Sequence, residues 1–325
     1  MKIRIKHIPA ILFVFIVLTS CNKKHKEIKL AHGLDTNHPV HKAMVFMSEK
    51  LDEKSEGELT VRVYPSNQLG SERECVELLQ IGSLGMTKVS AAVMSSFSPD
   101  FQVLSFPYLF RDKEHFFKVQ DSKLGKSLLL ESEKYWLRGM CYYDAGSRSF
   151  YTSKKQIKTP EDLKGLKIRV MQSPIAIEMV KAMGGSPTPM ASGEIYTAIQ
   201  QGVVDGAENN PPSYYYSRHY EVSKYYTIDE HASIPDVLLI STHIWNKLNE
   251  EEQKWLQEAV DESVIYQRKL WAESEAFTME KAKEEGAVIL YPDKAPFVKS
   301  VQPLYDELTK DKRIKELVNQ IKAIE

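Results

Sequence analysis

The sequence lacks the features that mark several large classes of protein. Its 325 residues include only three cysteines, too few for a disulfide-rich scaffold. No run approaches the roughly 18 consecutive apolar residues that a membrane-spanning helix requires. The 43 basic and 44 acidic side chains leave a net charge of −1, without the basic excess typical of nucleic-acid-binding proteins. These absences disfavour a disulfide scaffold, an integral membrane protein and a nucleic-acid partner.

Motifs of common enzyme classes are also missing. The chain contains no HExxH, GxSxG, GxxxxGK(S/T) or GxGxxG pattern. Its nine histidines show no spacing typical of a metal site, and His32, His38 and His41 are near in sequence but flank an expected helix start. Carboxylates are plentiful, but sequence spacing does not show whether two of them face each other as an acid–base pair. We therefore expect no metal ion and no cofactor, and we favour a binding protein over an enzyme.

The residues that are present indicate an α/β protein. Hydrophobic residues at 42% and charged residues at 27% are ordinary values for a globular chain that buries a large core. Strand-like segments at 28–31, 59–64 and 86–89 are separated by helical stripes at 39–54 and 72–81. This order of strand and helix predicts a mostly parallel sheet.

The second half of the chain repeats this order. A strand is expected at 166–171 and a helix at 176–183, followed by a helix that Ser192 caps and that continues through Gln201. Val203 and Val204 then begin another short strand. The repetition favours two α/β units with a cleft between them.

Residues 249–286 differ from the rest of the chain. They are rich in Glu and Lys and contain no Pro or Gly before the last position, Gly286. At roughly 1.5 Å per residue, an unbroken helix here exceeds about 50 Å, which is long enough to cross both units. Two shorter helices that meet at a kink are the alternative.

The N-terminus has the parts of an export signal. Residues 1–7 carry three basic side chains, and residues 8–18 form an apolar run of about 11 residues, the length of a signal-peptide core. The residues Leu-Thr-Ser-Cys at 18–21 resemble the cleavage box of bacterial lipoproteins. Cleavage there predicts a lipid anchor on Cys21, with 21–27 as a flexible tether to the membrane. An ordinary signal peptide that contains a cysteine is the alternative.

Removal of the predicted signal peptide, residues 1–20, changes the charge and the number of cysteines. Three basic side chains are lost, so 40 basic residues remain against 44 acidic ones. The mature protein would be exported and held at a membrane surface, in the periplasm or at the cell surface. Cys75 and Cys141 remain besides the anchor, and two free buried thiols are favoured over a disulfide between them.

Arg169 is the sharpest candidate for a ligand-binding residue. It lies in a strand between Ile168 and Val170, and the alternation of a strand sends it to the opposite face from these two. A helix opens shortly afterwards, so Arg169 lies at the carboxyl end of a strand, where open α/β sheets bind ligands. A guanidinium at this place matches a carboxylate with two hydrogen bonds. An exposed Arg on an edge strand fits the pattern equally well.

Residues 162–211 contain three long motifs. They read DLKGLKIRV, then GGSPTPM, and then EIYTAIQQGVVDGAENNP. The segments YPSNQLGSERE at 64–74 and FPYLFRDKEH at 106–115 belong to the same pattern. Together these motifs resemble the solute-binding proteins of TRAP transporters, the tripartite ATP-independent periplasmic transporters of the DctP type. The resemblance runs from about residue 29 to about residue 303.

The resemblance implies a fold like that of periplasmic binding proteins. Two α/β lobes, joined by crossing strands and by a long helix at about 249–286, close over an organic acid in the cleft between them. The solute-binding region would comprise residues 28–325. In this reading lobe I takes about 28–150 and 236–270, and lobe II takes about 151–235 and 287–307.

The resemblance also implies the ligand-binding residues. The central Arg that pairs with the ligand carboxylate corresponds to Arg169, and the second Arg of the family corresponds to Arg148 in DAGSRSFYT. Asn209 matches a ligand donor of relatives, and Glu72 matches an acidic residue that often reaches bound hydroxyls. Two residues at the carboxyl ends of their strands would also face the cleft. The implied set is Arg169, Arg148, Asn209, Glu72, Ser90 and His32.

The resemblance points to a sugar acid as the ligand. Many family members carry an aromatic residue after the PMA segment, where this chain has Ser192, which leaves room for a hydroxylated ligand or simply caps a helix. Residues 206–241, with Asn210 and the tyrosine run at 214–216, look similar to the subgroup that binds uronic acids such as glucuronate and galacturonate. A C4-dicarboxylate or a 2-keto acid is the alternative ligand.

The resemblance implies that the protein binds a solute outside the cytoplasm and delivers it to a transporter. The protein would bind the sugar acid as a monomer and hand it to the membrane permease subunits of a TRAP transporter. The same fold used as a ligand sensor is an alternative. A secreted enzyme that acts on sugar acids is a less favoured one.

Overall fold

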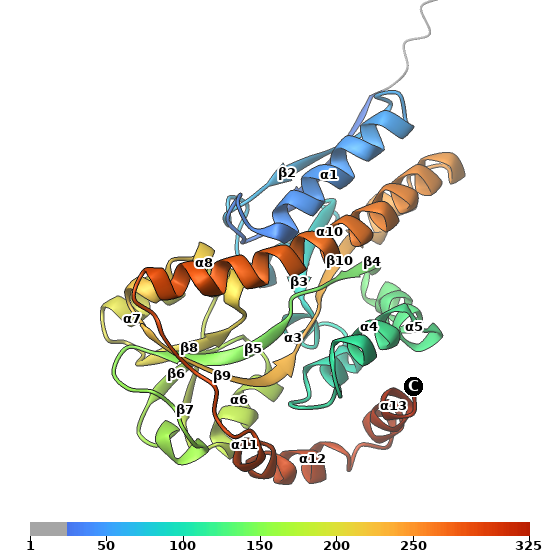
Figure 1. The fold of residues 1–325 in the computed structure, drawn as a ribbon. Helices are drawn as coiled ribbons and strands as arrows, with labels where there is room; N and C mark the ends of the chain where they lie inside the picture. The colour runs from blue at the N-terminus through green and yellow to red at the C-terminus, as the bar shows by residue number, and fades with distance from the viewer. Residues whose placement is uncertain (1–24) are drawn as a thin grey trace, which may run out of the picture.

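The structure is a computed structural model that describes residues 25–325. The predicted signal peptide at 1–20 and the lipid-attachment residue Cys21 lie outside the described residues, as does most of the predicted tether. Within residues 25–325 no helix is long and apolar enough to cross a membrane. The chain forms two α/β lobes, each built on its own sheet, as Figure 1 shows.

The first lobe is built on a five-stranded sheet with the order β2-β1-β3-β10-β4. In this sheet β1 pairs in parallel with β2 and β3, whereas β10 runs antiparallel to β3 and β4. Because β10 comes from far along the chain, the first lobe is completed by a segment that returns from the second. The strands are β1 (Lys26–Ala31), β2 (Leu59–Tyr64), β3 (Met86–Ser90), β4 (Leu137–Tyr143) and β10 (Asp236–Ser241).

The second lobe is built on a six-stranded sheet with the order β11-β9-β5-β8-β6-β7. Here β6 is parallel to β7 and β8, β5 is antiparallel to β8 and β9, and β11 is parallel to β9. The predicted lobe boundary at residue 150 falls inside β5. The strands are β5 (Ser147–Thr152), β6 (Lys167–Val170), β7 (Ser186–Pro189), β8 (Gly206–Asn209), β9 (Tyr225–Ser233) and β11 (Val288–Leu290).

Helices cover both sheets. The α-helices around the first sheet are α1 (Pro39–Lys54), α2 (Glu72–Gln80), α3 (Ala91–Met94), α4 (Lys113–Asp121), α5 (Lys123–Glu131) and α9 (Thr242–Trp245). Those around the second are α6 (Pro174–Ala182), α7 (Ile195–Gln200) and α8 (Pro211–Tyr216). Short 3-10 helices are η1 (Pro99–Ser105), η2 (Ser132–Tyr135), η3 (Pro160–Leu163), η4 (Ser192–Glu194) and η5 (His219–Glu221).

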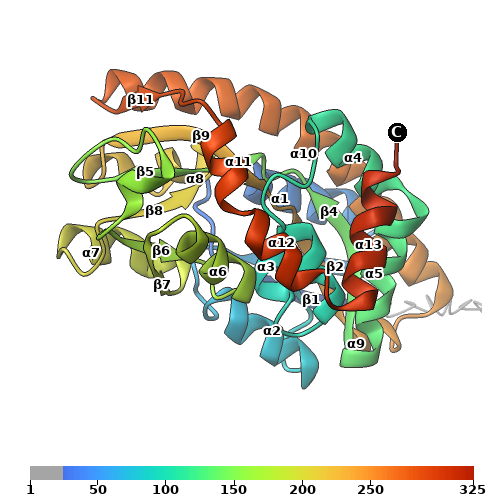
Figure 2. The same ribbon diagram turned by 90° about the horizontal axis from the view of Figure 1, so that it is seen from below.

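The C-terminal helices return from the second lobe to the first (Figure 2). Phe297 of α11 (Ala295–Ser300) and Leu304 of α12 (Gln302–Leu308) join the apolar core on one face of the second sheet. Leu317 and its neighbours on α13 (Lys312–Lys322) join the core of the first lobe. The C-terminal helices therefore connect the two lobes, in addition to the chain segments that pass between the two sheets.

The long helix α10 (Glu250–Glu284) is unbroken and packs against α1 of the first lobe and α8 of the second. Its start is fixed by a capping box, in which Asn249 Oδ1 accepts from the Glu252 backbone and Glu252 accepts from the Asn249 backbone. Acidic residues in its first turn and lysines in its last also suit the helix dipole. The prediction of one helix across both lobes is confirmed, and the kinked alternative is wrong.

Two short segments connect the sheets beneath α10. Residues 144–146 lead from β4 into β5, and residues 234–235 lead from β9 back into β10. Gly146 has φ +57°, and a Cβ added to it would lie 3.0 Å from Trp271 Nε1 of α10. Glycine is therefore favoured there both by the left-handed backbone and by the close approach of the helix.

Most elements lie where the sequence places them, with two exceptions. Ser192 does not cap the following helix; it begins the 3-10 turn η4, and α7 starts only at Ile195. The Glu194 carboxylate instead accepts from the Ala191 N–H, so the acidic residue satisfies the backbone at this turn. Val203 and Val204 lie in a turn, and the strand that they were expected to begin starts at Gly206.

The two cysteines of the described chain are free and buried, as predicted. Burial raises the pKa of the Cys75 thiol to about 11 and raises that of Cys141 further. Both thiols therefore stay protonated at neutral pH, and they serve as small apolar side chains in the first lobe.

Candidate functional site

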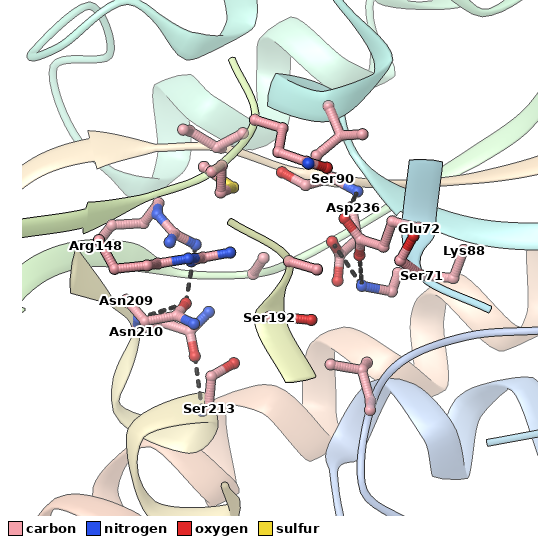
Figure 3. Close-up of a pocket in the computed structure, with 18 of the residues that line it drawn as sticks. Ser71, Glu72, Lys88, Ser90, Arg148, Ser192, Asn209, Asn210, Ser213 and Asp236 are labelled. Atoms are coloured by element: carbon pink, nitrogen blue, oxygen red, sulfur yellow. Dashed lines mark hydrogen bonds and ion pairs between the residues drawn. The ribbon is translucent and has the colours of Figure 1, made fainter. Parts of the chain in front are cut away.

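A cavity lies between the two lobes, and its wall is made by both of them (Figure 3). The loop after β1, the start of α2 and the end of β3 form one side. The end of β6, the turn before α7 and the segment from β8 into α8 form the other. The polar side chains of its lining are Ser71, Glu72, Lys88, Ser90, Arg148, Arg169, Gln172, Ser192, Asn209, Asn210, Ser213 and Asp236.

Arg169 reaches this cavity from the strand β6. The strand carries Ile168 and Val170 in the apolar core of the second lobe, and the intervening residue therefore points the other way. Its Nε and Nη2 donate to the carbonyl of Met190 at 3.0 and 2.7 Å. Since an arginine has five N–H donors, both on Nη1 and one on Nη2 remain for a ligand.

The charge of Arg169 has no counter-ion in the described chain. Its side chain is only 3% exposed, yet it forms no ion pair with any carboxylate of residues 25–325. Burial lowers the pKa of Arg169 below its ordinary value, and the neighbouring Arg148 acts in the same direction, although Glu208 opposes them. A buried cation without a partner is costly, and an anionic ligand relieves that cost.

Arg148 is held quite differently. Its Nε lies 2.5 Å from Glu208 Oε2, and its Nη2 donates to Glu208 Oε1 and to the Glu208 carbonyl at 3.0 and 2.8 Å. Its Nη1 donates to Asn209 Oδ1 at 2.8 Å. One N–H on Nη1 is left over, so Arg148 contributes positive charge to the cavity and a single free donor to a ligand.

A buried histidine extends this network below the cavity. His231 of β9 contacts Asp229 Oδ2 at 2.9 Å and Glu208 Oε2 at 3.4 Å. Burial alone would lower the pKa of His231, but the two carboxylates outweigh it and raise that pKa to about 9. Burial would likewise raise the pKa of Glu208, but Arg148 and His231 hold it at about 2. Glu208 therefore fixes the orientation of Arg148 and does not face the ligand.

The opposite wall carries a second buried ionic cluster. Lys88 Nζ of β3 lies 2.7 Å from Glu72 Oε1 and 3.2 Å from Asp236 Oδ1. Burial alone would lower the pKa of Lys88, but the carboxylates of Asp236 and Glu72 raise it above its ordinary value. One cation with two carboxylates leaves this wall with net negative charge and with several hydrogen-bond acceptors.

Five of the six predicted ligand-binding residues line the cavity. Besides the arginines and Glu72, Ser90 accepts the Ala92 N–H at 3.4 Å and so begins the short helix α3. Asn209 uses its oxygen for Arg148 and for the Asn210 N–H, which leaves its amide N–H groups without a protein partner in the described chain. Asn209 is therefore placed to donate to a ligand.

His32 is the exception among the predicted residues, because it is not part of the cavity lining. Its Nε2 lies 3.0 Å from His41 Nδ1, and its Nδ1 accepts the Leu34 N–H at 3.0 Å. Burial, followed by the nearby charge of Lys88, lowers the pKa of His32 to about 2. Both ring nitrogens are therefore engaged within the first lobe.

Several lining residues were not predicted from the sequence. Lys88 carried a signal in the sequence, since a lysine in the middle of the short strand MTKVS needs a partner of opposite charge if that strand is buried. Asp236 opens the apolar strand DVLLIS and carried a similar signal. The ion pair between Lys88 and Asp236 could not be predicted from the sequence, because 148 positions separate the two residues along the chain.

No group of three or more His, Cys, Asp or Glu side chains that could hold a metal ion occurs in residues 25–325. The cavity thus offers guanidinium groups on one side and an array of acceptors with one ammonium group on the other. Two lobes around such a cavity define a solute-binding protein for a polar, anionic small molecule.

Comparison with known proteins gives the family. The model of the bacterial extracellular solute-binding protein family 7 (DctP) matches residues 30–312. The protein YiiZ of Salmonella typhimurium is 41% identical over 298 residues, which cover 91% of each of the two sequences. The chain therefore belongs to this DctP family, and it is a solute receptor of the TRAP-transporter class.

Solved structures of the same class have the same fold. A TRAP periplasmic solute-binding protein of Xanthobacter autotrophicus Py2 with bound β-D-galacturonate has a TM-score of 0.89 at 38% identity, covering 92% of this chain and 100% of that one. One from Pseudomonas putida F1 with bound D-glucuronate has a TM-score of 0.88 at 35% identity, covering 92% and 98%. The predicted two-lobe α/β fold and the predicted family are confirmed.

Proposed function

We propose that this receptor binds a uronate, such as D-glucuronate or D-galacturonate, and delivers it to the membrane permease of a TRAP transporter. Arg169 is the observation that carries the proposal, because it is a buried cation with three free N–H donors and no counter-ion in the described chain. A ligand carboxylate supplies the missing charge. Arg148 adds positive charge and one donor beside it, and Asn209 adds an amide.

The opposite wall favours a sugar acid over a C4-dicarboxylate. A dicarboxylate has a second anionic end, which needs a second unpaired cation. Lys88 is the cation on that wall, and it is already paired with Glu72 and Asp236. Carboxylate oxygens are instead good acceptors for the hydroxyl groups of a sugar ring. The uronates bound by the two solved relatives are ligands of this kind.

A ligand screen tests the proposal. We expect uronates to raise the thermal midpoint of the purified protein, since a ligand at 100 times its Kd stabilises by about 2.7 kcal/mol. Succinate, malate and 2-keto acids at the same concentration should leave the midpoint near that of the free protein. A panel in which only dicarboxylates or keto acids stabilise the protein refutes the uronate assignment. Recovery of unchanged uronate after incubation, measured by NMR, distinguishes binding from turnover.

The proposal includes export and lipid attachment. Residues 1–20 act as a signal peptide, Cys21 carries the acyl chains, and the receptor works as a single copy at the membrane surface. Several acyl chains give stable anchoring where one does not. In a bacterial host, the wild-type chain should fractionate with membranes and Cys21→Ser should be released as soluble exported protein. Equal release of both chains contradicts the anchor and leaves the ligand assignment untouched.

A further inference from the structure

A second chamber opens from the ligand cavity. Four residues, Leu34, Ser192, Asn209 and Ser213, belong to the lining of both spaces, so the chamber adjoins the cavity directly. The chamber has a volume of about 130 Å³ and is partly open to solvent, because Ser192, Gly193 and Ser217 in its lining are exposed. It therefore offers room for a larger ligand than the cavity alone would take.

The chamber has a different chemistry from the cavity. Beyond the shared residues it is lined by the glycines 33 and 193 and by Ile195, Tyr196, Ser217 and His219. No Lys, Arg, Asp or Glu is among its lining residues, whereas the cavity has five such residues. Hydroxyl and amide groups around an aliphatic and an aromatic side chain are typical of a surface that binds an uncharged sugar ring.

His219 places an unpartnered donor at this chamber. Its side chain is 2% exposed, and its Nδ1 lies 2.7 Å from the hydroxyl of the fully buried Tyr151. The Tyr151 hydroxyl has no other acceptor in the described chain, so it donates to Nδ1, and the ring proton lies on Nε2. Burial, with Arg169 nearby, lowers the pKa of His219 to about 3, so the ring is neutral. The Nε2–H has no protein partner in residues 25–325 and is available to a ligand oxygen.

Ser192 stands where the two spaces meet. Its side chain is small and exposed, and Ala191, not Ser192, is the N-cap of the turn η4. An aromatic side chain at this position would occupy space where the two linings meet. The small residue leaves the cavity and the chamber continuous.

We propose that the chamber is a subsite for a neutral sugar carried by the bound uronate, so that the receptor takes a uronic acid joined by a glycosidic bond to a neutral pentose or hexose. This inference rests on the proposed uronate function and extends it. The uronate carboxylate binds at Arg169 and its hydroxyls face Glu72 and Lys88. The attached sugar lies beyond Ser192, with His219 Nε2 and Asn209 donating to its oxygens.

Calorimetric titration with three kinds of ligand tests this subsite. The ligands are free uronates, uronates with a neutral sugar at the anomeric carbon, and uronates attached through O4 to a neutral sugar. We expect wild-type protein to bind at least one of the two-sugar acids as tightly as the free uronate, or more tightly. Binding of free uronates with no measurable binding of any two-sugar acid overturns the subsite. Failure of every uronate to bind overturns the proposed function itself.

A substitution of a residue that lines only the chamber gives a second test of the inference. Ser217 lines the chamber but not the cavity, and its side chain makes no hydrogen bond within the described chain. Ser217→Phe adds bulk at an exposed edge of the chamber, so we expect it to weaken the two-sugar acid at least tenfold and to leave free uronate within threefold of wild type. Ser217→Ala, the matched control, should change neither. Ser217→Leu repeats the test with a smaller side chain if the Phe variant folds poorly. Equal effects of the Phe variant on both ligands refute the inference.

Discussion

At the scale of single residues, the two cleft arginines differ in what balances their charge. Arg148 is paired with Glu208, whereas Arg169 has two hydrogen bonds to a carbonyl and no counter-ion among residues 25–325. Removal of one partner of a buried ion pair leaves the other uncompensated, while removal of an unpaired buried cation relieves a cost. Substitution by methionine, an apolar side chain of similar reach, therefore separates binding from stability.

Arg169→Met should weaken uronate binding more than tenfold, about 1.4 kcal/mol or more, without lowering the stability of the ligand-free protein. Arg148→Met should also weaken binding, but it should destabilise the ligand-free protein, by the roughly 3–5 kcal/mol that is usual for a broken buried pair. Titration calorimetry and chemical denaturation measure the two quantities. Near-normal uronate affinity in the Arg169 variant would remove it from the role of anchor.

The pH dependence of stability tests the protonated histidine below the cavity. His231 has a pKa raised to about 9, because Asp229 and Glu208 face it, and the ring of Phe150 packs against it. Below its unfolded pKa, about 6.5, both states carry the proton and the stabilisation is complete. As the pH rises from there through 9, only the folded state holds the proton, and stability falls by up to about 1.4 kcal/mol per pH unit.

Denaturation of wild-type protein between pH 6.5 and 9 should therefore show declining stability. His231→Gln should flatten this slope, whatever it does to the absolute stability. His243→Gln removes an exposed histidine at the far end of the first lobe and should keep the wild-type slope. Parallel slopes in wild type and His231→Gln contradict a protonated His231.

At the scale of elements, the sequence predicts the position of a site residue where that position depends on a single strand. The alternation in LKIRVM places Arg169 opposite Ile168 and Val170, and the structure has this arrangement. The long helix was predictable because neither Pro nor Gly interrupts it. The pairing of Lys88 with Asp236 was not predictable, because it depends on β10 returning beside β3 from the other lobe. The sequence also did not predict that His32 contacts His41, which lies on the next helix.

The connection between β4 and β5 offers a test of the close packing under α10. Gly146→Ala has to adopt a left-handed backbone and also to place its Cβ 3.0 Å from Trp271 Nε1. Gly165→Ala, the matched control, has φ +79° but no atom within 4 Å of the new Cβ. Both should lose about 1–2 kcal/mol for the backbone. The Gly146 variant should lose more in chemical denaturation, and equal losses would show that Trp271 does not restrict this connection.

At the scale of the whole molecule, the two lobes approach each other closely at Asn67 of the first lobe and Gly193 of the second. Asn67 lies on the loop after β2 in the first lobe, with φ +59°, and Gly193 lies on η4 in the second. A Cβ added to Gly193 would come within 2.8 Å of Asn67 Nδ2. Neither residue lines the ligand cavity. Their contact therefore reports on how closely the lobes approach, independently of contacts to the uronate in the cavity, although Gly193 also lines the adjoining chamber.

Gly193→Ala should consequently lower uronate affinity several-fold by opposing closure, although it removes no ligand contact. Asn67→Gly removes the opposing side chain and tolerates the left-handed backbone, so the double variant should recover most of the wild-type affinity. The recovery is the decisive observation, because a substitution that merely disturbed η4 would not be rescued from the other lobe. Small-angle X-ray scattering with saturating uronate should show a larger radius of gyration for Gly193→Ala than for the double variant. If the two single effects simply add, the lobes do not meet at this contact when the ligand is bound, and closure is limited elsewhere.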